Sequence, residues 1–383
     1  MTTKPPPGWI TTTIGEACSI RNDLRLPISR EERATMEGPF PYYGPTGQLD
    51  AISNFRLDGT FALIGEDGDH FLDVEKKPQT ILVSGKFNVN NHAHVVESTN
   101  QCGAEWFYNY FRHKSLRPFL TRQGAGRYKL NKAALQEVPI VLPPPEEQQA
   151  INALFREWDT AIQKTEQLIA AKERHQGALV QRLYALSDNR GSSSRFGDLL
   201  EESMEAGSTG RYARKITVKL YGKGVLAKEE KRQGSEQTQY FIRRAGQLIY
   251  SKLDFLNGAF GLVPPELDGY ESTLDLPAFD IAPTVNPIWL IGYLTRPTYY
   301  THQVGLARGQ RKARRVHPSD LLASSLQVPP RDLQDRIARF FTFSQDDIDK
   351  SKRLLESLKA QKRGLMQKLL TGQWRLQVQE EAN

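Results

Sequence analysis

The sequence predicts an α+β chain: two strand-rich α/β lobes separated by two long helices that form an antiparallel coiled coil, with an approximate twofold axis. Three observations predict it. A proline-free heptad pattern follows residue 145, the same pattern returns after residue 330, and short apolar runs between turns precede each pattern. The predicted domains are a first lobe at residues 1–142, a central helix at 143–187, a second lobe at 195–327 and a C-terminal helix at 328–373.

The predicted start of the central helix is a proline run, Pro143–Pro145, followed by Glu146 and Glu147. Proline suits the first turn of a helix, and a helix N-terminus favours negative charge. Apolar residues then recur in alternating steps of four and three, the period of helices that wind around each other. They are Ile151, Phe155, Trp158, Ile162, Ile169, Leu179 and Leu183, with Thr165, Lys172 and Gln176 at the intervening seam positions.

The C-terminal helix repeats this pattern 186 residues later, the difference between Pro329 and Pro143. Eleven of the 45 aligned positions are identical, whereas average residue usage would give about three. Its seam is formed by Ile337, Phe341, Ser344, Ile348, Ser351, Leu355, Leu358, Lys362, Leu365 and Leu369. The chain therefore contains an internal duplication. A twofold axis that crosses the helices would place them antiparallel and hold one lobe at each end.

Composition and charge restrict the class of protein. The 383 residues suffice for two or three domains, and the net charge of +7 favours a polyanionic partner. The two cysteines, Cys18 and Cys102, lack metal-binding spacing and are expected as reduced thiols. Since we find no signal peptide and no apolar stretch long enough to span a bilayer, we expect a cytoplasmic protein.

Both lobes contain concentrated positive charge. Arg112–Lys132 holds seven Lys/Arg without an acid, Arg211–Arg232 holds eight against two acids, and Arg308–Arg315 holds five in eight residues. One such stretch alone is compatible with a solvated surface, but recurrence in both lobes favours DNA, where arginine reads guanine edges and lysine contacts phosphates. The candidate DNA-binding residues are Tyr43, Arg122, Arg127, Lys129, Tyr221, Lys223, Lys228, Lys252, Arg311, Lys312 and Arg314.

Over essentially its whole length the chain resembles a specificity subunit of a type I restriction–modification system. The resemblance rests on lobe–helix–lobe–helix order and on two P-P-x-x-x-Q entries, Pro143–Gln148 and Pro329–Gln334. Further matching segments are Tyr42–Gly44, Leu63–Gly68, Val218–Gly224, Tyr250–Asp254 and the helix ends Leu183–Leu186 and Leu369–Gly372. The first helix departs from the family pattern by ending in Ala-Leu, and the second lacks the acid pair after its prolines.

The resemblance implies a non-catalytic subunit that binds double-stranded DNA and two methyltransferase subunits, joined in the full complex by restriction/translocase subunits. The expected target is a split, asymmetric sequence with one adenine methylated in each half. The resemblance places S-adenosylmethionine, ATP and Mg²⁺ in the partner subunits and no cofactor in this chain.

Three alternatives compete with this interpretation. A methyltransferase would need an Asn-Pro-Pro-aromatic box, but Asn286–Trp289 lacks the second proline, and Gly222–Ala227 lacks the strand–helix setting of a nucleotide loop. His92 and His94 resemble a metal pair, but two histidines at this spacing without a cysteine or clustered carboxylates are more often strand residues. A coiled-coil linker protein without a DNA role would leave the two basic lobes unexplained.

Overall fold

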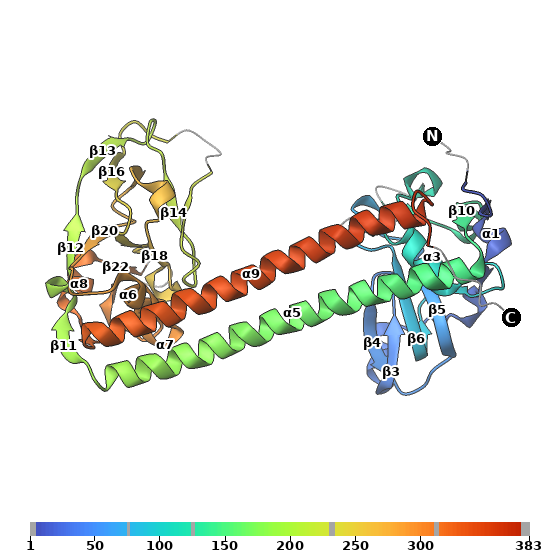
Figure 1. The fold of residues 1–383 in the computed structure, drawn as a ribbon, viewed down its shortest axis with the longest axis horizontal. Coiled ribbons are helices and arrows are strands. Elements are labelled where there is room, and N and C mark those ends of the chain that lie inside the picture. The colour runs from blue at the N-terminus through green and yellow to red at the C-terminus, as the bar shows by residue number, and fades with distance from the viewer. Residues whose placement is uncertain (1–4, 75–76, 124–126, 230–233, 310–313, 377–383) are drawn as a thin grey trace. The chain divides into compact units, whose positions relative to one another are not determined.

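The computed structural model describes residues 5–74, 77–123, 127–229, 234–309 and 314–376 (Figure 1). The chain divides into two compact units, residues 1–165 with 355–383, and residues 166–354. The division passes through both long helices, so each unit contains one lobe and one part of each helix. The α+β fold with two long helices is confirmed.

The first lobe is built on a six-stranded sheet in the order β2-β7-β5-β6-β3-β4. The neighbours are antiparallel except β3 and β6, which run parallel. The strands are β2 (Ser19–Ile20), β3 (Glu37–Tyr43), β4 (Gln48–Ile52), β5 (Leu57–Gly65), β6 (Thr80–Val89) and β7 (Ala93–Glu97). Shorter elements are α1 (Ile14–Ala17), α2 (Arg30–Ala34), α4 (Lys132–Gln136), and β1 (Ile10–Thr13) paired with β10 (Pro139–Leu142).

Helix α3 (Ala104–Phe111) packs on β5 and β6 and links the sheet to the long helices. Its buried rings share one core with apolar side chains from both long helices: Trp106, Phe107 and Phe111 with Ile151, Phe155, Met366 and Leu369. The end of the second long helix thus completes the core of the first lobe.

The second lobe has smaller sheets. A four-stranded sheet runs β12-β20-β17-β18 and a three-stranded sheet runs β13-β16-β19. Their bounds are β12 (Leu200–Ser203), β13 (Ala206–Thr209), β16 (Gln239–Arg243), β17 (Leu248–Tyr250), β18 (Phe260–Leu262), β19 (Tyr270–Ser272) and β20 (Ala278–Ile281). Two-stranded pairs are β11 (Ser192–Arg195) with β23 (Ser325–Val328), β14 (Ile216–Val218) with β15 (Val225–Ala227), and β21 (Ala307–Arg308) with β22 (Arg315–Val316). Helices α6 (Pro287–Leu294), α7 (Pro297–Tyr300) and α8 (Pro318–Ala323) complete this lobe.

The long helices are α5 (Pro145–Asp188) and α9 (Arg331–Leu370) (Figure 1). Each helix follows two prolines. Its first turn is closed by a backbone hydrogen bond: the N–H of Gln148 donates to the carbonyl of Pro144 at 3.0 Å, and the N–H of Gln334 donates to that of Pro330 at 3.2 Å. In the second unit Lys172 contacts Ser351 (3.0 Å) and Gln176 contacts Ser344 (2.9 Å). Numbers rise along one helix as they fall along the other, so this pair is antiparallel. In the first unit Asp159 lies against Lys362 (2.5 Å).

Candidate nucleic-acid interface

In the first unit, the basic stretch forms a hairpin of β8 (Thr121–Gln123) and β9 (Arg127–Lys129). Arg122 is exposed; its guanidinium lies over the ring of Tyr128 at 5.3 Å and donates to the Tyr128 hydroxyl at 3.2 Å. Arg127 pairs with Gln123 across the hairpin through its backbone. The hairpin thus presents the predicted residue Arg122 to solvent in a defined orientation.

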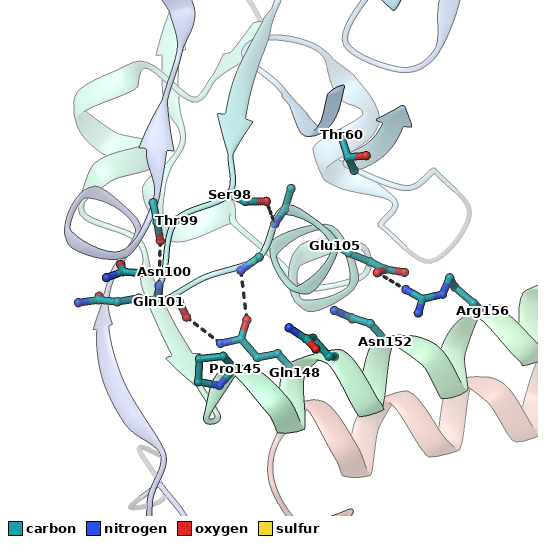
Figure 2. Close-up of a pocket in the computed structure, with 13 residues that line it drawn as sticks. Thr60, Ser98, Thr99, Asn100, Gln101, Glu105, Pro145, Gln148, Asn152 and Arg156 are labelled. Atoms are coloured by element: carbon teal, nitrogen blue, oxygen red, sulfur yellow. Dashed lines mark hydrogen bonds and ion pairs between the residues drawn. The ribbon is translucent and has the colours of Figure 1, made fainter. Parts of the chain in front are cut away.

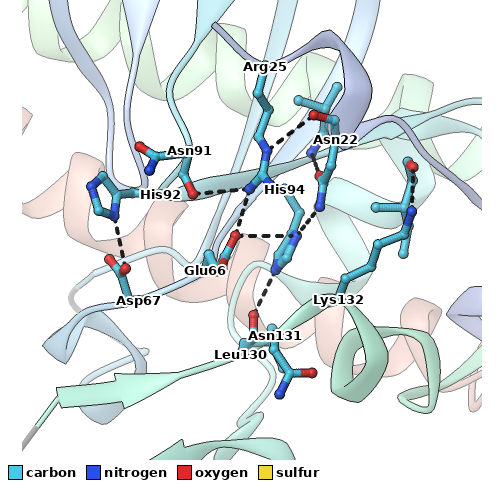
Figure 3. A network of polar contacts seen from close by, with 12 residues as sticks. Asn22, Arg25, Glu66, Asp67, Asn91, His92, His94, Leu130, Asn131 and Lys132 are labelled. Carbon is cyan, nitrogen blue, oxygen red and sulfur yellow. Dashed lines mark hydrogen bonds and ion pairs between the residues drawn. The ribbon is translucent and has the colours of Figure 1, made fainter. Parts of the chain in front are cut away.

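The base of this hairpin is fixed to the end of β5 by a network around Glu66 (Figure 3). The Glu66 carboxylate lies 2.6 Å from Arg25 and 3.3 Å from Lys129, and the backbone N–H of Leu130 donates to the Glu66 carbonyl at 2.7 Å. Burial opposes ionisation of Glu66, but hydrogen bonds from Arg25 and Lys129 outweigh it and hold its pKa below the ordinary value. Lys129, predicted to bind DNA, therefore also holds the hairpin in place.

His94 lies under the same network as a buried side chain. It contacts the carbonyl of Leu130 at 2.7 Å and the Asn22 side-chain amide at 2.9 Å, and burial lowers its pKa. His92 instead contacts Asp67 at 2.9 Å. Within the described part of the chain, no group of three or more His, Cys, Asp or Glu side chains is arranged to hold a metal ion. Both histidines therefore make hydrogen bonds within the lobe.

Tyr43, at the end of β3, is half-buried. Its ring packs edge-on against Phe87 at 5.9 Å and borders the cluster formed by β5, β6 and β7. The structure therefore gives Tyr43 a packing role, and its predicted DNA contact stays a prediction.

In the second unit, two predicted segments lie together. The turn that joins β14 to β15 carries Tyr221 and Lys223. A backbone hydrogen bond links it to the segment that follows Lys252, because the N–H of Tyr221 donates to the carbonyl of Asn257 at 2.9 Å. Lys223 is exposed, as is Lys228 just after β15. The carbonyl of Lys252 accepts a hydrogen bond from the N–H of Val316 at 3.0 Å. This contact brings the third basic stretch, Arg308–Arg315, to the same region.

The third basic stretch is only partly described. Arg314 is exposed just before β22, and Arg315 lies 3.7 Å from Asp275. Arg311 and Lys312 lie outside the described residues.

The joint between lobe and helix was not recognised from the sequence. Gln148 is buried; its Oε1 accepts from Gly103 N–H (3.2 Å), and its Nε2 donates to the carbonyl of Gln101 (2.7 Å) (Figure 2). The Nε2 atom also donates to the carbonyl of Pro143 at 3.0 Å. Gly103 is the N-cap residue of α3. The amide therefore ties the start of the lobe helix to the start of the long helix.

The second unit repeats this joint. Gln334 accepts from the N–H of Asn286, the N-cap residue of α6, at 2.7 Å and donates to the Pro329 carbonyl at 2.9 Å. Helices α3 and α6 thus correspond, and they align 183 residues apart (286 − 103), with Trp106 matching Trp289 and Tyr110 matching Tyr293. The change of offset from 186 to 183 concealed this match.

Beside the first joint lies a polar cavity of about 530 Å³. Its wall includes Gln148, Asn152 and the ion pair of Glu105 with Arg156, all visible in Figure 2. Gln148 binds the backbone, Asn152 accepts from the side-chain amide of Asn109 at 2.9 Å, and Glu105 pairs with Arg156, so these polar groups already have partners within the joint. Separately, no described helix is long and apolar enough to cross a membrane.

Comparison with known proteins agrees with this architecture. Residues 6–173 match the family model of the type I restriction modification DNA specificity domain. A Haemophilus influenzae protein named as the type I restriction enzyme specificity subunit S.HindORF215P is 35% identical over 131 residues. That alignment covers 34% of this chain and 32% of the relative, so the chain matches about one third of the relative's length.

Two solved structures share the fold over nearly the whole chain. The S subunit of a type I restriction-modification system from M. genitalium is 12% identical, with a TM-score of 0.60 over 96% of this chain and 98% of its own. The HsdS subunit from Thermoanaerobacter tengcongensis is 16% identical, with a TM-score of 0.50 over 97% and 99%. Residues 6–173 are therefore similar to the type I restriction modification DNA specificity domain, and the whole chain shares its fold with these two solved S subunits.

Proposed function

We propose that this chain is the DNA-recognition subunit of a type I restriction–modification complex and acts in the cytoplasm. Each lobe reads one part of a split, asymmetric DNA target. The chain docks two methyltransferase subunits, and restriction/translocase subunits join the full complex. It performs no chemistry itself, and S-adenosylmethionine, ATP and Mg²⁺ act in the partner subunits.

The repeated joint carries this proposal. Gln148 and Gln334 make the same pair of bonds, one to the N-cap residue of the lobe helix and one to a proline carbonyl five residues before. The first joint lies within the residues that match a DNA specificity domain. The second unit is thus a second module of the same design with a different lobe, as a two-part asymmetric target requires.

The exposed basic and aromatic groups support DNA as the ligand. Arg122 in the first unit, and Tyr221 and Lys223 in the second, lie on hairpins that are fixed to the lobe by backbone hydrogen bonds. Fixed hairpins with cationic side chains suit contact with phosphates and base edges. The net charge of +7 favours the same partner.

The test is binding of labelled random duplex DNA by the chain with its methyltransferase subunit, over a series of salt concentrations. We expect log affinity to fall linearly with log salt, because neutralised phosphates release counterions. The chain alone, mixed with S-adenosylmethionine, should methylate no DNA. Absence of salt-dependent binding, with and without the methyltransferase, would instead favour a coiled-coil scaffold without a DNA role.

A further inference from the structure

The turn Leu220–Lys223 has a backbone that does not suit its sequence. Lys223 N–H donates to the Leu220 carbonyl at 3.3 Å, and the two central residues have positive φ, 59° at Tyr221 and 66° at Gly222. Positive φ at both central positions is the signature of a type I′ turn, whose first central position favours Asn, Asp or Gly. Among the described residues, Tyr221 is the only non-glycine with positive φ.

This conformation is held from three sides. Tyr221 N–H donates to Asn257 (2.9 Å) and Gly222 N–H to Gly258 (2.8 Å), while Lys219 N–H closes the hairpin on Gly224 (2.9 Å). A Cβ atom at Gly222 would lie 2.8 Å from the side chain of Thr295, so this face of the turn packs against the lobe. The backbone therefore fixes the direction in which the Tyr221 side chain leaves the turn.

The Tyr221 side chain does not compensate for the strain by burial. It is 63% exposed, and the neighbouring Leu220 is 37% exposed. Exposed lysines, Lys219 and Lys223, flank the pair. A rigid apolar tip between cations suits duplex DNA, because lysines contact phosphates while an aromatic ring stacks on or wedges between bases.

We propose that Tyr221 is a base-contacting residue of the second lobe, whose ring stacks at a base step within the half of the target that this lobe reads. The proposal rests on the proposed DNA-recognition function and adds a residue and a mode of contact. Backbone strain at an exposed residue persists where the side chain is needed for function. In the free protein an asparagine would suit the turn better.

The test compares wild type, Tyr221→Asn and Tyr221→Phe in the full chain with its methyltransferase subunit. The probes are a duplex carrying the motif that the wild type methylates and the same duplex with 2-aminopurine at successive positions of each half. We expect Tyr221→Asn to keep or raise the melting temperature, because Asn-Gly is the favoured type I′ pair. Its affinity for the motif should fall roughly 5- to 150-fold, the effect of one lost aromatic–base stack.

The fluorescence change of 2-aminopurine should disappear in one half only, and Tyr221→Phe, which keeps the ring, should behave as wild type. The proposal is overturned if Tyr221→Asn binds and discriminates as wild type does. Loss of stability and binding together would also overturn it, since Tyr221 would then be a packing residue. If the wild type directs no methylation at all, the DNA-recognition function itself fails, which the wild-type arm shows separately.

Discussion

Replacing Gln148 with alanine should loosen the first lobe from its long helix. The substitution removes three hydrogen bonds made by a buried amide. Gln101 is exposed, so water can satisfy its carbonyl, but the N–H of Gly103 and the buried carbonyl of Pro143 lose their partner. An unsatisfied buried group costs about 1–3 kcal/mol, so we expect a loss of about 2–4 kcal/mol in the free energy of unfolding.

The assay is urea unfolding followed by far-UV circular dichroism. Gln149→Ala is the matched control, because Gln149 is the exposed neighbour on the same helix, and a surface change of this kind shifts stability by less than about 0.5 kcal/mol. Gln334→Ala should reproduce the loss in the second unit. Equal unfolding midpoints for Gln148→Ala and Gln149→Ala would refute the view that this amide is the joint.

Three further predictions follow from charged and titratable groups. Glu66→Gln removes the charge partner of Lys129, so amide hydrogen exchange in the β8–β9 hairpin should rise; unchanged exchange would contradict that role. Asp159→Ala removes the carboxylate that pairs with the ammonium group of Lys362, whose side chain is only 7% exposed. Because Asp159 itself is half-exposed, the free energy of unfolding should fall by less than the roughly 3–5 kcal/mol lost when a fully buried pair is broken. The double change Asp159→Gln with Lys362→Gln, which copies the Gln345–Gln176 contact at the repeat-related positions, should recover stability. Below about pH 6.5 the melting temperature should fall, because burial lowers the pKa of His70 and His94 and the unfolded chain therefore binds more protons. A flat profile from pH 7.5 to 5 would contradict neutral burial of these two side chains.

The long helices were predictable because their signal is local and periodic. A heptad seam needs only residues three and four apart, and the constant spacing between Pro143 and Pro329 revealed the duplication. The polar seam positions also proved to meet one another, as Gln176 meets Ser344. The sequence did not indicate that the end of α9 completes the first lobe, because that core joins residues more than 200 positions apart, such as Trp106 and Leu369.

The candidate site was predictable only as composition. Basic stretches located the hairpins, but the sequence carries no sign that Lys129 is paired with Glu66. The pair Tyr221-Gly222 also does not predict positive φ at Tyr221, because this conformation depends on hydrogen bonds to Asn257 and Gly258. Both facts depend on contacts between segments far apart in the chain.

The central claim is that one chain carries two lobes that recognise different halves of a DNA target. It is tested most directly by methylome sequencing of a host that carries this chain with its methyltransferase subunit. The account predicts a methylated-adenine motif in two unlike halves separated by a fixed gap, present with the chain and absent without it. A continuous palindromic motif, or methylation that does not depend on the chain, would contradict it.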